Sequence, residues 1–541
     1  MTDAKDHETE VHPLKNEEGV PPNTPSKKGI FSTSSKLSRW RTAAFFVSLF
    51  LCLIVVFAFS FIIPCPVRPV SQRTWKRSYE DASTFNILGI LDANNDKVND
   101  VIFAFKASDN LLNVSCSDEE ILSPCVFLTA ICGRNGSVLS LRPVSQDQIW
   151  ARCEVSKLGG VEHPSCLLYN SQDLLVIDSK TDSILWRKNN SQNFKTPVLM
   201  VPDVDQDGVE DLAVITSTGD STTILFVSGK SGIQIGSQVD LNLQQTSGHL
   251  IHLASRDSYY ILFKKGSAIH GYALKNILAL AMEGLKISAG LQEDSNWRLL
   301  TVNSTVNSVI IHYSDLIQHV FEVPNKDKTS RNLLVITDHQ LEIINGKTLN
   351  PLWKKFNAPA MIRETAFGYF NNDEIVDVIA EEEYGNNTKK VAIYDGSTGS
   401  SLWEIVLKSN LKNPKPSTVK AADHRSVFLF WGRFLDAVSS SLDEQQFLYW
   451  LHPSHPKVIL ELRNTTEEVV VFQALLFEKS RHAGYILLSG STNPMKTGNV
   501  TLFKGRFKED ISHSRVINLG EETFTDEEIR NIFLRMRYSS E

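Results

Sequence analysis

A short pattern that recurs about every 50 residues limits the possible folds of this chain more than any other feature of its sequence. Each copy has two apolar residues, a small polar turn and a second apolar segment that often ends in Trp. The first turn residues of the clear copies are Cys132, Asp178, Ser228, Asn345 and Asp395, so the gaps are 46, 50, 117 and 50 residues, and the long gap spans two units. Strand, tight turn and strand at this period are typical of propeller blades.

We therefore expect an all-β fold, a single large β-propeller of about seven four-stranded blades over residues 85–520. Weaker copies near residues 269, 448 and 500 bring the visible units to seven or eight, and the two ends of the chain can share one blade. Unrelated β-hairpins would not keep returning to a spacing near 50 residues.

Two loops between these apolar segments carry acidic side chains at alternating positions. In residues 201–216, "VPDVDQDGVEDLAVIT", the expected ligands are Asp203, Asp205, Asp207, the Val209 carbonyl and Asp211. The corresponding residues of "LDANNDKVNDVIFAF" are Asp92, Asn94, Asp96, the Val98 carbonyl and Asp100. Hard oxygen ligands at this spacing suit Ca²⁺. An apolar strand follows in place of the helix of an EF-hand, so we expect two structural calcium loops that lead into strands.

Two further loops have lost part of this pattern. "FGYFNNDEIVDVIAEE" keeps Asn371, Asp373 and Asp377 but has Tyr369 at the first ligand position, which predicts a weak metal site. The stretch from Val323, "VPNKDKTSRNLLVIT", is one residue shorter and has lost most ligands, so we expect a turn without metal.

The beginning of the chain predicts a membrane anchor. Residues 1–41 are polar with scattered Pro and Ser, which is typical of a disordered tail. Thr42–Ile63 has 22 residues and no charge, enough to span roughly 30 Å of hydrocarbon as a signal-anchor helix. Residues 64–84 would then form a juxtamembrane stalk. The basic residues on the two sides of the span favour a cytosolic tail only weakly.

Cysteines and glycosylation motifs support the same orientation, type II. Five of the seven cysteines lie between residues 116 and 166, which indicates disulfides formed in an oxidising compartment. Because five is odd, Cys65 is either a sixth partner or a bridge between two chains. The disulfide candidates are Cys65, Cys116, Cys125, Cys132, Cys153 and Cys166. The N-x-S/T motifs, all after the span, are at Asn113, Asn135, Asn189, Asn303, Asn386, Asn464 and Asn499. Free, buried cysteines in a cytosolic domain are the alternative.

The last segment, residues 521–541, predicts a short amphipathic helix and a tail. Thr525 and Glu528 have the spacing of a capping box, and Ile529 and Phe533 share one helical face. We expect this helix to dock on the propeller of its own chain.

These motifs carry a family resemblance. The loops that begin at 92, 203 and 369 resemble the FG-GAP calcium loops of integrin alpha propellers. With the opening "MTDAKDHETEVHPLKNEEG", one anchor and a long repeat region, the chain resembles the type II membrane proteins called family with sequence similarity 234. The resemblance implies a cell-surface FG-GAP-type propeller of poorly defined activity.

The sequence favours a binding protein over an enzyme. It contains no H-E-x-x-H, C-x-x-C or G-x-S-x-G motif, and its net charge of −7 argues against a nucleic-acid partner. We expect a non-enzymatic platform at the plasma membrane, or within the secretory pathway, that binds a cell-surface or extracellular protein and no small-molecule substrate. The alternative is an ectoenzyme, glycosidase-like or quinoprotein-like, with its site in the central channel.

Overall fold

The computed structural model describes residues 35–62, 74–108, 114–189, 193–218, 221–283, 290–302, 306–356, 361, 364–408, 413–434, 445–478, 483–521 and 524–539. It divides into two compact units, residues 1–69 and residues 70–541. Most of the expected tail lies outside the described residues. The disulfide candidate Cys65 and the glycosylation motifs at Asn113 and Asn303 also lie outside them.

The described part of the first unit is a long helix, α1 (Ser35–Ile62). Its stretch Trp40–Phe57 is apolar, long enough to cross a membrane and without buried surface. Residues 35–41, which the sequence analysis assigned to a disordered tail, are helical and extend this helix toward the amino terminus.

The second unit is a β-propeller whose blades follow one another in the sequence. Blade 1 consists of the second half of β1 (Trp75–Leu91) with β2 (Asp100–Ala107), β3 (Cys125–Ile131) and β4 (Val138–Ser145), and blade 2 consists of β5 (Trp150–Val155), β6 (Ser165–Tyr169), β7 (Asp173–Asp178) and β8 (Ile184–Asn189). Blade 3 consists of β9 (Phe194–Val201), β10 (Asp211–Thr218), β11 (Ser221–Val227) and β12 (Gln234–Gln244). Blade 4 consists of β13 (Gly248–Ser255), β14 (Ser258–Lys265), β15 (Ala268–Ala273) and β17 (Ser308–His312), with β16 (Thr301–Val302) as an additional edge strand. Between β15 and β16 lie two helices, α2 (Leu274–Ala281) and α3 (Ser295–Leu299).

Blade 5 consists of β18 (Ile317–Pro324), β19 (Arg331–Thr337), β20 (Gln340–Ile344) and β21 (Pro351–Phe356), and blade 6 consists of β22 (Ala366–Gly368), β23 (Asp377–Gly385), β24 (Thr388–Tyr394) and β25 (Ser401–Lys408). Blade 7 consists of β26 (Ser417–Lys420), β27 (Ser426–Gly432), β28 (Gln446–Leu451) and β29 (Val458–Thr465), with β33 (Arg515–Asn518) at the edge. Blade 8 consists of β30 (Val469–Leu476), β31 (Ala483–Ser489) and β32 (Gly498–Arg506) with the first half of β1. Two helices, α4 (Phe507–His513) and α5 (Asp526–Leu534), complete the chain.

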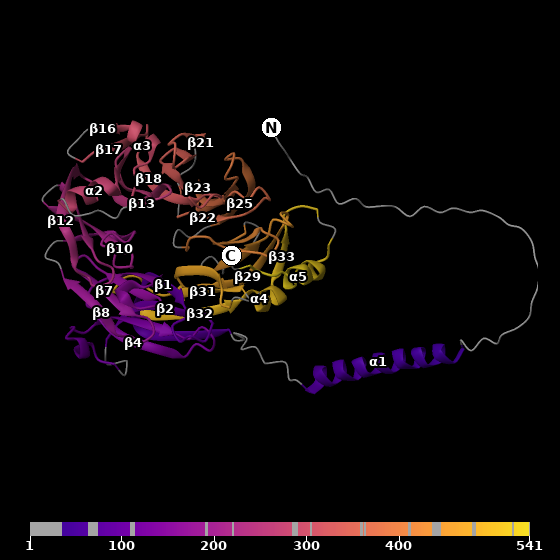
Figure 1. Cartoon of the computed structure of the whole chain (residues 1–541). Helices are drawn as coiled ribbons and strands as arrows, with labels where there is room; N and C mark the ends of the chain where they lie inside the picture. Colours follow the sequence, from indigo (N-terminus) through magenta and orange to yellow (C-terminus); the bar gives the residue numbers. More distant parts are fainter. Residues whose placement is uncertain are drawn as a thin grey trace, which may run out of the picture. The chain divides into compact units, whose positions relative to one another are not determined.

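The strand β1 belongs to two blades and closes the ring. Its first part pairs with β32, from Trp75 opposite Lys504 to Ala82 opposite Gly498, and its second part pairs with β2. Figure 1 shows the indigo β1 and β2 beside the yellow β31 and β32. The described residues therefore form eight blades of four strands, two of which carry a fifth strand at the edge, and the two ends of the chain share one blade.

The propeller begins ten residues earlier than expected. Residues 75–84, assigned from the sequence to a stalk, lie in β1, because they complete the blade that β32 leaves without its fourth strand. The described part of the chain thus has sheet structure from Trp75 to Asn518.

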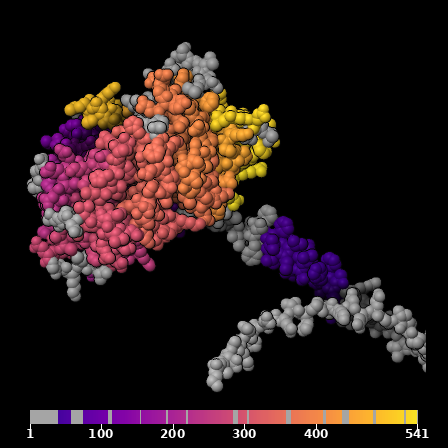
Figure 2. Space-filling model, turned by 90° about the horizontal axis from the view of Figure 1, so that it is seen from above, coloured from indigo at the N-terminus to yellow at the C-terminus, as the bar shows by residue number. Residues whose placement is uncertain are grey.

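The apolar core lies between the blades. The described residues form eight apolar clusters, each at the contact of two consecutive blades, and one of them joins blades 8 and 1. Figure 2 shows the same order on the surface, where the colours run in sequence from magenta through orange to yellow. A strand such as β27 is buried on both faces because a neighbouring blade covers each of them.

Tryptophan side chains connect consecutive blades by hydrogen bonds. Trp186 Nε1 at the end of blade 2 donates to the Gly229 carbonyl of blade 3 at 3.0 Å, and Trp353 Nε1 of blade 5 donates to the Gly396 carbonyl of blade 6 at 2.9 Å. Equivalent bonds run from Trp75 to Gly133, from Trp297 to Gly346 and from Trp403 to Pro456. The Trp of the sequence repeat therefore serves blade packing.

The carboxyl-terminal helix docks on blade 7 and blade 8. Thr525 and Glu528 form the capping box, and Ile529 and Phe533 are buried in the cluster between these blades. The Phe533 ring lies 4.4 Å from that of Trp450, centroid to centroid.

Two disulfides staple the first two blades, Cys116 to Cys125 and Cys153 to Cys166. Cys132, also a disulfide candidate, has a free thiol that is buried in the turn between β3 and β4. Each bonded pair joins cysteines 9 or 13 residues apart, which shows that the stapling is local.

Candidate calcium loops and a pocket between blades 5, 6 and 7

The loop between β9 and β10 gathers the acidic residues of the expected first calcium site. The N–H of Asp207 donates to Asp203 Oδ1 at 3.1 Å and to Asp205 Oδ1 at 3.2 Å, and the N–H of Gly208 donates to Asp203 Oδ2 at 2.9 Å. These bonds wind the backbone around the carboxylates. Gly208 has a φ of 87°, which a glycine adopts without strain.

The carboxylates of this loop lie close enough to share one cation. Oxygens of Asp203, Asp205 and Asp211 all lie within 4.8 Å of one another. Burial, with the nearby charge of Asp207, raises the pKa of Asp205. The carboxylates in this loop repel one another, and a bound cation would remove that repulsion. Carboxylate and carbonyl oxygens are the ligands that Ca²⁺ prefers. The residues present therefore fit a calcium ion.

The loop between β1 and β2 has the same hydrogen bonds. The N–H of Asp96 donates to Asp92 Oδ1 at 3.0 Å and to Asn94 Oδ1 at 2.9 Å, and the N–H of Lys97 donates to Asp92 Oδ2 at 2.9 Å. Val98 donates its N–H to Asp96 Oδ1. Asn94 replaces one acid, so this loop has less negative charge than the loop at 203.

The last acid of each loop also ties the loop to the neighbouring turn. Asp211 accepts the N–H of Val204 at 2.6 Å and that of Gly229 at 3.0 Å, and Asp100 accepts the N–H groups of Ala93 and Gly133. Burial raises the pKa of both carboxyls to about 6. Gly229 is required because a Cβ there would lie 1.9 Å from the Glu210 carbonyl oxygen.

The third loop, between β22 and β23, keeps the turn with fewer acids. Asp377 accepts the N–H groups of Phe370 and Gly396, and Asp373 accepts that of Ile375. Asn371 donates from its side chain to Asp395 at 2.9 Å. Tyr369 takes the position of the first acid, so the residues here fit calcium less well than those of the loop at 203.

In the fourth loop, between β18 and β19, side chains accept hydrogen bonds from the backbone of the turn and do not converge on a possible metal position. Asp327 accepts the N–H groups of Thr329 and Ser330, and Asn332 accepts the N–H of Gly346 at 3.3 Å. This loop therefore keeps the hydrogen bond to the neighbouring turn, although it lacks most of the calcium ligands.

One set of loop contacts was missed from the sequence. The first residue of the turn between the third and fourth strands contacts the acidic loop: Ser228 Oγ donates to Asp207 Oδ2 at 3.2 Å, and Cys132 Sγ lies 3.7 Å from Asn94 Nδ2. The repeat alignment marks these turn residues, but the sequence does not show that they lie beside the loop of their own blade.

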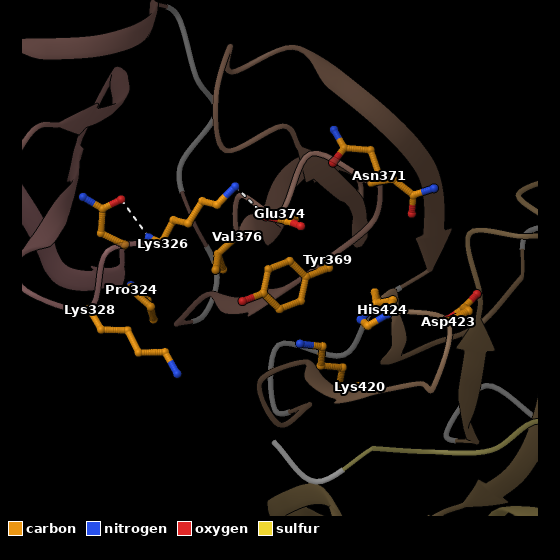
Figure 3. A pocket seen from close by; sticks show the side chains of 12 residues that line it. Pro324, Lys326, Lys328, Tyr369, Asn371, Glu374, Val376, Lys420, Asp423 and His424 are labelled. Carbon is orange, nitrogen blue, oxygen red and sulfur yellow. Dashed lines mark hydrogen bonds and ion pairs between the residues drawn. The ribbon is translucent and has the colours of Figure 1, made fainter. Parts of the chain in front are cut away.

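The corresponding loops of blades 5, 6 and 7 surround a pocket of about 530 Å³ (Figure 3). It is lined by Pro324, Asn325, Lys326, Lys328, Tyr369, Asn371, Asn372, Glu374, Val376, Lys420, Asp423 and His424. Lys326 Nζ pairs with Glu374 Oε2 at 2.5 Å, and Lys420 Nζ lies 4.8 Å from the centre of the Tyr369 ring. Lysines thus border this pocket, whereas acids occupy the loops of blades 1 and 3.

A second cavity, of about 560 Å³, is lined by Asn86, His319, Glu364, Lys415 and Glu468 among others. Glu364, Lys415 and Glu468 lie where the outer strand of one blade leads into the inner strand of the next, whereas Asn86 lies in β1 and His319 in β18. The Glu364 carboxylate pairs with Lys415 Nζ at 3.0 Å. The carboxylate that enters this cavity from blade 6 is therefore neutralised by an ammonium group.

The described glycosylation motifs lie on the surface. The Asn side chains at positions 135, 189, 386, 464 and 499 are all exposed. All five can receive a glycan without disturbing the core.

The sequence of this chain is similar to that of one protein family over its whole length. The family model described as "FAM234A/B beta-propeller" matches residues 75–539. The chain is 36% identical to human Protein FAM234A and 36% identical to its mouse counterpart, with all of each chain covered. Mouse Protein FAM234B is 28% identical over 91% of this chain and 80% of that protein.

Two solved structures show a distant similarity of fold. Dihydro-heme d1 dehydrogenase NirN has a TM-score of 0.41 at 10% identity, covering 73% of each chain. The WD40 domain of SCAP from fission yeast has a TM-score of 0.40 at 12% identity, covering 79% of this chain and 98% of that one. Neither carries an argument about function.

Proposed function

Because this chain belongs to the FAM234A/B β-propeller family, we propose that it is a non-enzymatic, single-pass type II membrane glycoprotein whose propeller binds another protein at the cell surface, with structural Ca²⁺ in two loops. The observation that carries the proposal is the convergence of Asp203, Asp205 and Asp211 in a loop that joins two core strands of a blade. Calcium there would hold the loop rigid for binding.

Membrane attachment is supported by α1. Its stretch Trp40–Phe57 exposes apolar side chains along its whole length, and none of the described residues of its own unit covers them. Such a surface is stable in a bilayer and costly in water.

Orientation is supported by the chemistry of the propeller. The disulfides Cys116–Cys125 and Cys153–Cys166 require an oxidising compartment to persist. The exposed Asn residues of the glycosylation motifs suit the same compartment. We therefore place the propeller in the lumen of the secretory pathway and, after transport, outside the cell.

The absence of catalysis is part of the proposal. Among the described residues, the group most like a catalytic one is Ser454, His452 and Asp423: His452 Nδ1 lies 2.7 Å from Ser454 Oγ, and Nε2 lies 3.5 Å from Asp423 Oδ1. Burial lowers the pKa of His452 to about 4, so its imidazole is a poor base at neutral pH. His452 Nδ1 also accepts the backbone N–H of Ser454, two residues away. The contact between His452 and Ser454 is therefore part of a local turn.

The calcium proposal is tested on the full-length protein in detergent micelles. We expect calcium at ten times its dissociation constant to stabilise the propeller by about 1.4 kcal/mol per loop, and we expect that constant to be on the order of 10⁻⁴ to 10⁻³ M. The double substitution Asp205→Asn and Asp207→Asn should remove the contribution of the loop at 203. Thermal unfolding with calcium and with chelator measures both effects.

The matched control for this test is Asp147→Asn, an exposed acid outside the metal loops. It should respond to calcium as the unmodified protein does. Equal unfolding temperatures with calcium and with chelator in the unmodified protein would contradict the calcium proposal.

The binding proposal is tested by presenting the full-length protein in nanodiscs to an array of cell-surface proteins, with calcium and then with chelator. A partner that binds in calcium and is lost with chelator supports a calcium-braced receptor. If no partner binds in either condition, the ectoenzyme alternative gains weight over the interaction platform.

A further inference from the structure

We propose that the pocket between blades 5, 6 and 7 binds an oxyanion, a carboxylate or sulfate group, held by Lys328, Lys420 and the Tyr369 hydroxyl. This inference concerns blades without the full calcium ligand set, and it does not rest on the calcium or partner proposals. The pocket volume of about 530 Å³ is in the range of small-molecule sites.

The charge of the side chains is reversed at one structural position of the blades. The connection between the first and second strands carries Asp203, Asp205 and Asp207 in blade 3. The same connection carries Lys326 and Lys328 in blade 5, and Lys420 stands at its start in blade 7. In blade 6, Tyr369 replaces the first acid. The loops that carry mainly acids in blades 1 and 3 thus carry lysines in blades 5 and 7, where Lys326, Lys328 and Lys420 outnumber the acids of the pocket lining.

The ammonium groups of the pocket outnumber its carboxylates. Lys326 pairs with Glu374 at 2.5 Å, so these two charges offset each other. Lys328 and Lys420 add two positive charges against the one negative charge of Asp423, because the buried imidazole of His452 beside Asp423 is neutral at neutral pH. The Lys328 ammonium group is exposed and makes no hydrogen bond or ion pair with any residue that the structure describes.

The donor groups of Lys328, Tyr369 and Lys420 lie around the same pocket. Figure 3 shows Tyr369 between Lys328 and Lys420, with its hydroxyl end on the side of Lys328. Lys420 Nζ lies 4.8 Å from the ring centre, a cation–π contact that limits the positions of this ammonium group. Two ammonium groups and one O–H around a common opening can donate to several oxygens of one oxyanion.

The anion could come from two sources, a free small acid or an acidic side chain of a bound polypeptide. Both use the same chemistry, so the experiment has three probes: inorganic sulfate, glucuronate, and a short peptide with three consecutive Asp residues. Binding to the full-length protein in nanodiscs is measured by isothermal titration calorimetry at low ionic strength. Sulfate or glucuronate binding without peptide binding identifies a small acid, and preference for the peptide identifies a protein ligand.

The variants are chosen to preserve the fold. Lys328→Gln and Lys420→Gln should each weaken anion binding about three- to tenfold, and Tyr369→Phe should weaken it about two- to threefold while the ring stays in place. Lys347→Gln is the matched control, because Lys347 is exposed in blade 5 but lies outside the pocket lining. Its affinity should equal that of the unmodified protein.

Two results would overturn the proposal. One is failure of all three probes to bind the unmodified protein at millimolar concentration. The other is binding that the double variant Lys328→Gln and Lys420→Gln retains in full, which would locate the anion elsewhere. If Lys420→Gln does not fold, Lys328→Gln and Tyr369→Phe decide the matter, since the first changes an exposed side chain and the second removes only a hydroxyl.

Discussion

At the scale of single residues, a buried histidine makes the stability of the propeller depend on pH. His249 Nε2 lies 2.7 Å from the Pro197 carbonyl oxygen, and burial lowers the pKa of this imidazole to about 4. The unfolded chain binds a proton there near pH 6.5, whereas the folded chain stays neutral. Stability from this residue is therefore complete above pH 6.5 and is lost as the pH falls toward 4.

We expect His249→Gln to remove this dependence. Between pH 7 and pH 5, His249 should lower the free energy of unfolding by about 2 kcal/mol, and the variant should lack that loss because glutamine does not titrate. Chemical denaturation at the two pH values measures the difference. His339→Gln, a change at an exposed histidine, is the control. Equal losses in the unmodified protein and in His249→Gln would show that His249 does not titrate as described.

At the scale of elements, the tryptophan hydrogen bonds hold neighbouring blades in register. Trp353→Phe removes the N–H that donates to the buried Gly396 carbonyl, and an unpaired buried carbonyl costs about 1–3 kcal/mol. Trp431→Phe makes the same change in ring size at a buried indole N–H without a hydrogen-bond partner among the described residues. We expect Trp353→Phe to lower the free energy of unfolding more than Trp431→Phe does. The reverse order in urea denaturation would mean that ring packing, rather than the hydrogen bond, joins blades 5 and 6.

At the scale of the whole molecule, β1 closes the ring between the first and the last blade. Deletion of residues 75–82 would remove the strand that pairs with β32 and the burial of Trp75, a loss on the order of 5 kcal/mol. We expect this variant to unfold at lower temperature and to associate through the exposed edge of β32. Thermal unfolding and size-exclusion chromatography test this, with deletion of residues 21–28 as the control of equal length. An unchanged unfolding temperature would mean that the ring does not need this closure.

The sequence by itself determined the features that depend on neighbouring residues. The turns at Cys132, Asp178, Ser228, Asn345 and Asp395, the convergent oxygens of the loop at 203 and the capping box of α5 each involve contacts within about ten residues, so their spacing is visible in one stretch of chain. The propeller follows from the repetition of such units, since each blade needs a neighbour to cover its apolar faces.

Only the tertiary structure decided the features that join distant segments. The pairing of Trp75 with Lys504, which makes eight units from a chain expected to form about seven blades, depends on closure of the ring. The hydrogen bonds of the tryptophans to the next blade and the pocket shared by Lys328, Tyr369 and Lys420 join residues 40 or more positions apart. Local spacing carries no information on such contacts, because they form only when whole blades pack side by side and bring their loops together.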